Sequence, residues 1–154
     1  MKKYFLITFF VLTLSSNVSS NASTIISIEE YIATNQDKSK EIIASYLAKR
    51  CSATFQIVSR ILNEGDIEDQ RIIESMQVYA AEVADIAIRI DAALSNRDFD
   101  EVAKEVNQKV DETFNILWSI SEEHYSKTGV YLEPHAQDLK RCQFSFRKKI
   151  ENNK

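Results

Sequence analysis

The most reactive side chains in this sequence belong to two cysteines and two histidines. Cys51 and Cys142 lie 91 residues apart, so they do not form the Cys-x-x-Cys spacing of a redox-active pair. An even number of cysteines favours a structural disulfide in an exported chain, and we predict a Cys51–Cys142 bridge. Two buried free thiols are the alternative. A bridge that closes so long a loop stabilises a fold by about 4–5 kcal/mol.

The histidines lack the partners that metal or haem chemistry needs. Neither His124 nor His135 has a second histidine or a cysteine at metal-ligand spacing. Glu123 is adjacent to His124, whereas carboxylate metal sites in helical bundles use Glu-x-x-His. No Cys-x-x-Cys-His motif is present for covalent haem attachment, and an axial pair of Met76 with either histidine has no support. We therefore expect no metal and no cofactor.

Motifs of catalysis are also missing from the sequence. It contains no Gly-x-Ser-x-Gly, no His-Glu-x-x-His and no glycine-rich phosphate loop. A Ser-His-Asp site would have to be assembled without any sequence signal. We predict that the protein is not an enzyme.

A short basic pattern precedes both cysteines. Lys49 and Arg50 stand directly before the first cysteine, and Lys140 and Arg141 before the second. In the simpler interpretation, each cysteine faces the core while the preceding bases reach solvent. In the functional interpretation, the four bases form one basic interaction patch over the disulfide, able to hold an anionic group.

Aromatic side chains could line a ligand pocket in the interior. The candidates are Phe55, Phe114, Trp118, Phe144 and Phe146. Aromatic residues at helical spacing more often fill a core than surround a ligand, so a pocket is the alternative interpretation.

The elements that carry these residues are predicted to be helical. The chain has 154 residues but only two glycines and one proline, which argues against a turn-rich all-β fold. Apolar residues recur at steps of three and four, which is typical of amphipathic helices. The pattern predicts helices over residues 38–63, 66–95, 98–128 and 134–150, with a short extra helical turn over 27–34.

Capping residues mark the ends of these helices. Asp37, Asp66 and Asp98 are expected N-caps, and Gly65 and Gly129 are expected helix ends. Four amphipathic helices with short connections are typical of an antiparallel four-helix bundle. In such a bundle the first and fourth helices are neighbours, and their two cysteines can lie level, as a bridge requires. We therefore predict an all-α, antiparallel four-helix bundle held by one disulfide.

The first 22 residues are typical of a secretory signal peptide. They begin with two lysines, continue with an apolar run over residues 5–14 and end in Ser20-Asn21-Ala22. We predict cleavage after Ala22, with cleavage after Ser20 as the alternative. An uncleaved anchor is disfavoured because spanning a bilayer takes about 20 apolar residues. The mature domain would be residues 23–154, exported to the periplasm or the cell exterior, and the short leader is typical of bacteria.

Charge is segregated along the chain. Residues 37–63 carry five bases and two acids, residues 64–123 five bases and sixteen acids, and residues 139–154 six bases and one acid. The acidic balance of the mature domain, without a recognition motif, disfavours nucleic acid as a partner, and no later segment is apolar enough to cross a membrane. We predict a non-enzymatic module that binds a partner protein through a charged face. The alternative is a small-ligand carrier with a cavity lined by Phe55, Phe114, Trp118 and Phe146.

Overall fold

The chain is described by a computed structural model over residues 25–65 and 70–152, with side chains through Phe146. Within these residues it is all-helical. The elements are α1 (Ile28–Thr34), α2 (Lys40–Glu64), α3 (Gln70–Ser95), α4 (Phe99–Thr128), a 3₁₀ turn η1 (Glu133–His135) and α5 (Ala136–Asn152). The predicted all-α class is confirmed. The predicted signal peptide and the Asp66 cap lie outside the described residues.

Helix ends follow local capping chemistry. Asp98 is the N-cap of α4, and its carboxylate accepts hydrogen bonds from the backbone amides of Asp100 and Glu101. Gly129 ends the same helix in the left-handed conformation, with φ of 75°. The prediction for α2 was wrong: its N-cap is Ser39, whose hydroxyl accepts from the amide of Ile42, because residue 37 belongs to the turn after α1.

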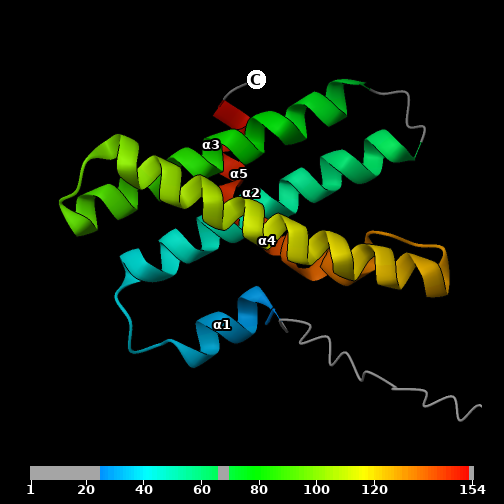
Figure 1. Cartoon of the computed structure of the whole chain (residues 1–154), viewed down its shortest axis with the longest axis horizontal. Helices are drawn as coiled ribbons and strands as arrows, with labels where there is room; N and C mark the ends of the chain where they lie inside the picture. The colour runs from blue at the N-terminus through cyan, green and yellow to red at the C-terminus, as the bar shows by residue number, and fades with distance from the viewer. Residues whose placement is uncertain (1–24, 66–69, 153–154) are drawn as a thin grey trace, which may run out of the picture.

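Helix α2 is the central element of the fold. It contacts α1, α3, α4 and α5. In Figure 1, α2 and α3 run side by side, α4 crosses in front of them, and α5 passes behind. We expected four aligned antiparallel helices, and that finer arrangement stays a prediction.

Small residues let α2 and α3 approach closely. Residues 50–55 of α2 are all buried, and α3 presents buried alanines such as Ala80 and Ala87. The hydroxyl of Ser52 donates to the Ala80 carbonyl at 2.8 Å, and Ser59 donates to the Ile73 carbonyl at 3.4 Å. These bonds satisfy polar groups that burial would otherwise leave unpaired.

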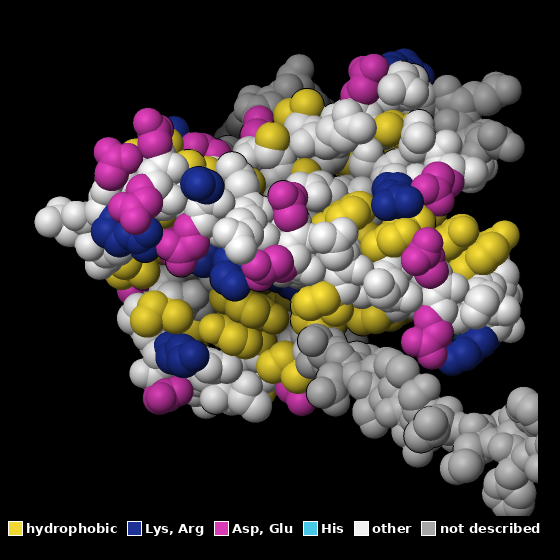
Figure 2. Space-filling view, viewed as in Figure 1, with side chains coloured by type: hydrophobic (Ala, Val, Ile, Leu, Met, Phe, Trp, Pro, Cys, Tyr) yellow, Lys and Arg dark blue, Asp and Glu magenta, His cyan; other side chains and the backbone are white. Residues whose placement is uncertain are grey.

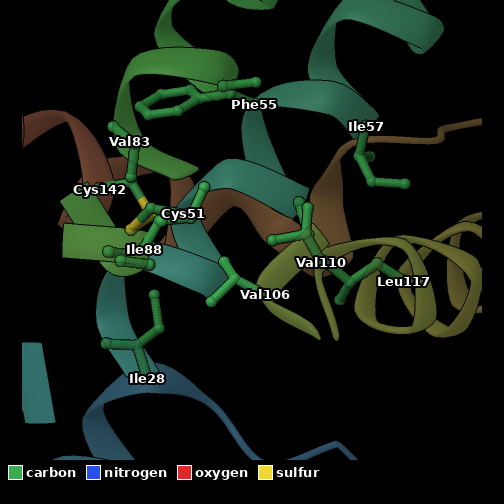
Figure 3. Packing of buried hydrophobic residues seen from close by; sticks show 14 of the residues in the cluster. Ile28, Cys51, Phe55, Ile57, Val83, Ile88, Val106, Val110, Leu117 and Cys142 are labelled. Carbon is green, nitrogen blue, oxygen red and sulfur yellow. A yellow bond between two sulfur atoms is a disulfide. The ribbon is translucent and has the colours of Figure 1, made fainter. Parts of the chain in front are cut away.

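The core lies between α2 and its neighbours and contains the predicted disulfide. Figure 3 shows the bridge from Cys51 on α2 to Cys142 on α5, surrounded by aliphatic side chains that include Val83, Ile88 and Val106. Both cysteines are fully buried, and their Cα atoms are 5.4 Å apart. The prediction of a structural bridge is confirmed.

No helix within the described ranges is long and apolar enough to span a bilayer.

Candidate functional site

A buried ion pair joins three helices beside the disulfide. Arg50 on α2 is only 4% exposed, and its Nε donates to Asp138 Oδ2 on α5 at 2.7 Å. Asp138 Oδ1 accepts a hydrogen bond from the backbone amide of Ile28, the first residue of α1, at 3.2 Å. One buried carboxylate therefore holds α1, α2 and α5 together.

This ion pair adjoins a buried histidine. His135 Nε2 lies 2.8 Å from Ser121 Oγ and 3.1 Å from the carbonyl oxygen of Leu117. Burial lowers the pKa of His135 below its usual value, and the positive charge of Arg50 lowers it further. The imidazole is therefore neutral at neutral pH and ties η1 to α4.

The two hydrogen-bond contacts of His135 Nε2 fix the orientation of its imidazole. A carbonyl oxygen can only accept, so His135 Nε2 carries the proton that it donates to Leu117 and cannot take one from Ser121. Both side chains are buried, and both carboxylate oxygens of Asp138 are bonded to other groups. The Ser121 hydroxyl is therefore not accessible from solvent in this arrangement.

An open cleft lies on the other side of Arg50. It has a volume of about 390 Å³ and is bordered by residues of α1, α2, α3 and α4. Its apolar wall consists of Ile25, Tyr31, Ile42, Tyr46 and Leu94. Figure 2 shows hydrophobic side chains gathered along this hollow, between α4 and the α1–α2 segment. The cleft is the candidate functional site.

Two stacked tyrosines form one end of the cleft. The rings of Tyr31 and Tyr46 are nearly parallel, at 10°, with centroids 3.4 Å apart. Burial is the main cause that raises the pKa of Tyr46, so its phenol is neutral and can donate a hydrogen bond at neutral pH. Flat apolar surface and a phenolic group thus occur together at this end.

A hydrogen-bonded polar cluster lies beside the apolar wall. Asp91 accepts from the hydroxyl of Ser45 at 2.5 Å and forms an ion pair with Lys49 at 2.6 Å. Arg50 is balanced by Asp138, and Lys109, on the α4 side, pairs with Glu112 at 2.8 Å. The cleft therefore offers hydrogen-bonding groups with little net charge. That combination can bind and orient a ligand, but it supplies no activated nucleophile.

The four bases of the predicted patch lie in different environments. Arg50 is buried in its pair with Asp138, which corrects the expectation that each of these bases reaches solvent. Lys49 is half-buried against Asp91, while Lys140 is exposed and Arg141 half-buried on α5. Arg50 is buried because its guanidinium pairs with the buried carboxylate of Asp138. Whether the others bind a partner stays a prediction.

The predicted aromatic pocket is not this cleft. The cleft is lined by none of the four residues predicted for that pocket, which are Phe55, Phe114, Trp118 and Phe146. Phe55 is fully buried in the core, Phe146 packs against that core, and Trp118 stacks on Tyr131 with centroids 5.6 Å apart. Phe114 borders a separate hollow whose other residues are mostly polar. Phe144 is exposed.

The histidines were expected to lack catalytic or metal-binding partners. His124 lies 2.9 Å from the exposed carboxylate of Glu133. Within the described residues, no group of three or more histidine, cysteine, aspartate or glutamate side chains is arranged to hold a metal ion.

Sequence reasoning missed the buried ion pair, although a signal for it was present. Asp138 precedes Cys142 by one helical turn, and Arg50 is adjacent to Cys51. A disulfide between these cysteines brings the two charges to the same interface. Ser45, Asp91 and the two stacked tyrosines carried no comparable signal, because they come from three separate helices.

The comparisons with known proteins give no further guide to this site. No family model, curated protein or solved structure matches the chain.

Proposed function

We propose that this is a non-enzymatic binding protein whose cleft holds the apolar body of a small amphiphilic molecule. The supporting observation is the hollow of about 390 Å³, with an apolar wall and hydrogen-bonding groups gathered beside it. Clefts of roughly 300–1,000 Å³ with such a mixed lining are typical of small-molecule sites. The proposal keeps the small-ligand function suggested by the sequence but moves the site away from Phe55, Phe114, Trp118 and Phe146.

The lining suggests how each part of a ligand would bind. Ile42 and Leu94 offer apolar contacts, so burying a hydrocarbon chain there supplies the binding free energy. Lys49 uses one ammonium proton for Asp91 and has further donors for a polar head group. Because the neighbouring charges are paired, the head group is recognised by hydrogen bonds more than by net charge.

The test is a titration of the oxidised protein with decanoate, decanol and decyltrimethylammonium, followed by NMR of the methyl groups. We expect saturable shifts of the Ile42 and Leu94 methyl signals. Ile42→Ser should weaken binding about fivefold, because roughly 1 kcal/mol of apolar contact is lost. The matched control is Ile72→Ser on α3, since Ile42 is 42% and Ile72 45% exposed but only Ile42 lines the cleft.

Two results would contradict the cleft as the binding site. One is the absence of saturable shifts with all three probes. The other is equal weakening by Ile42→Ser and Ile72→Ser. Comparing the three probes then identifies the preferred head group.

A second candidate is a protein-interaction module that binds its partner at the apolar cleft, in place of the charged face that the sequence predicted. It is favoured by the exposed apolar side chains at the cleft, where Ile42 and Leu94 offer contacts to a partner's side chain. Photo-crosslinking from the cleft, in the native compartment, should then trap one defined protein. Leu94→Ser should abolish that crosslink and Val78→Ser should not, although Leu94 is 50% and Val78 51% exposed.

We also propose that the protein is exported after cleavage at Ala22 and folds as the predicted four-helix bundle. The buried Cys51–Cys142 bridge supports an oxidising compartment. The intact mass of the protein from the exported fraction tests the cleavage site and the oxidation of the two cysteines. It should match residues 23–154, or 21–154 for cleavage after Ser20, less two hydrogens; a chain that starts at Met1 would contradict cleavage.

A further inference from the structure

The outward face of α5 carries an exposed aromatic ring among basic residues. Phe144 is 75% exposed, the largest exposed fraction among the large hydrophobic side chains described. Lys140 precedes it by one turn and Arg141 by three residues, so all three lie on one side of the helix. Cys142 and Phe146 lie on the opposite side and face the core.

The bases of this face are not neutralised by acids. Within the described residues Lys140 and Arg141 form no ion pair, whereas Lys49, Arg60, Arg89 and others each pair with a carboxylate. Asp138 is the one acid between residues 136 and 146, and it is buried against Arg50. The sequence continues α5 with three further bases before its next acid, Glu151.

We propose that this face of α5, defined by Lys140, Arg141 and Phe144, docks the protein onto the surface of an anionic phospholipid bilayer. The bases would contact lipid phosphates, and the Phe144 ring would enter the boundary between head groups and acyl chains. An exposed aromatic ring beside a long basic side chain suits that boundary, because the ring of Phe144 is apolar while the ammonium group of Lys140 is exposed to water.

The rest of the fold favours one orientation on such a surface. Helices α3 and α4 together carry eleven acids and five bases, while α5 packs against α2 and η1. An anionic membrane therefore attracts the α5 face and repels the acidic helices. This surface is separate from the cleft, so the inference does not depend on the cleft binding a ligand.

The test is co-sedimentation of the oxidised protein with vesicles, one set of phosphatidylcholine and one of phosphatidylcholine mixed with phosphatidylglycerol. We expect binding to the anionic vesicles only, with weaker binding as salt screens the charges. Phe144→Ser should weaken binding about tenfold. This fold-change corresponds to the lower end of the free energy that burying a phenylalanine side chain contributes. Lys140→Gln should weaken it about fivefold, which corresponds to one charge at a lipid surface.

Two matched variants on α4 serve as controls. Phe99 is also exposed, at 47%, and Lys104 is exposed and has no ion pair within the described residues. Phe99→Ser and Lys104→Gln should leave vesicle binding within about twofold of the unmodified protein, because neither residue lies on α5. All four positions are exposed, so thermal unfolding should show that each variant folds.

Several outcomes would overturn the proposal. These are no binding to anionic vesicles, equal weakening by the control variants, or binding that Phe144→Ser leaves unchanged. Binding to soluble polyglutamate in place of vesicles, with the same dependence on Lys140, would assign the face to an acidic protein instead. Inhibition of vesicle binding by millimolar inorganic phosphate would point to a free phosphate site rather than a membrane surface.

Discussion

Breaking the buried Arg50–Asp138 ion pair should cost far more stability than breaking an exposed ion pair, and Asp138→Ala tests this expectation. The substitution removes the carboxylate that balances a guanidinium only 4% exposed and also leaves the amide of Ile28 without its acceptor. Removing one partner of a buried pair costs about 3–5 kcal/mol, because the remaining charge stays desolvated. A domain of this size is stable by about 5–15 kcal/mol in total, so the variant should still fold.

The exposed pair Arg89–Asp85 is a close control. There Arg89 Nε lies 2.8 Å from Asp85 Oδ2, against 2.7 Å for the same two atom types in the buried pair. Asp85→Ala should cost far less than Asp138→Ala, because solvent screens that pair. Urea unfolding of the oxidised proteins, followed by circular dichroism, gives both free energies of unfolding.

A double substitution distinguishes the loss of the attraction between Arg50 and Asp138 from the cost of leaving the Arg50 charge buried without a partner. Arg50→Met combined with Asp138→Leu replaces both charges by apolar side chains, so we expect it to recover most of the stability lost in Asp138→Ala. The reasoning is refuted if Asp138→Ala costs no more than Asp85→Ala. It is also refuted if the double variant is less stable than Asp138→Ala alone.

Three further predictions concern stability. Replacing Cys51 and Cys142 together by alanine should lower the free energy of unfolding, measured by urea denaturation, by about 4–5 kcal/mol. A loss below about 1 kcal/mol would contradict a stabilising role of the disulfide. Burial and the charge of Arg50 lower the pKa of His135 below 6.5, so on acidification the unfolded chain binds a proton before the folded protein does. The free energy of unfolding should therefore be highest above about pH 6.5 and fall as the pH drops from there toward the lower folded-state pKa. His135→Gln should remove this fall when the urea midpoint is measured against pH. Gly129→Ala should cost about 1–2 kcal/mol and lower the melting temperature, because φ is 75° there while an added Cβ would meet no atom within 4 Å.

The cleft and the α5 face would serve different purposes. The cleft is bordered by α1, α2, α3 and α4, whereas Lys140, Arg141 and Phe144 belong to α5. Vesicle binding should therefore tolerate Ile42→Ser, and amphiphile binding should tolerate Lys140→Gln.

Local patterns in the sequence predicted the helices well because the causes are local. Apolar spacing, the scarcity of glycine, and caps such as Asp98 and Gly129 act within one or two turns. The disulfide was also predictable, because Cys51 and Cys142 are the only cysteines and fall near the middle of their predicted helices. The error at Ser39 arose where two acceptable capping residues stand close together.

Which side chains meet depends on the packing of the helices. The helical class of the described residues, the segregated charge and the Cys51–Cys142 bridge were predictable, because composition and periodicity express those properties directly. The sequence could not decide that Arg50 turns inward to Asp138, nor that Ser45, Asp91, Tyr31 and Tyr46 border one cleft. Those contacts join helices far apart in the chain, and they depend on how α1, α3 and α5 pack around α2.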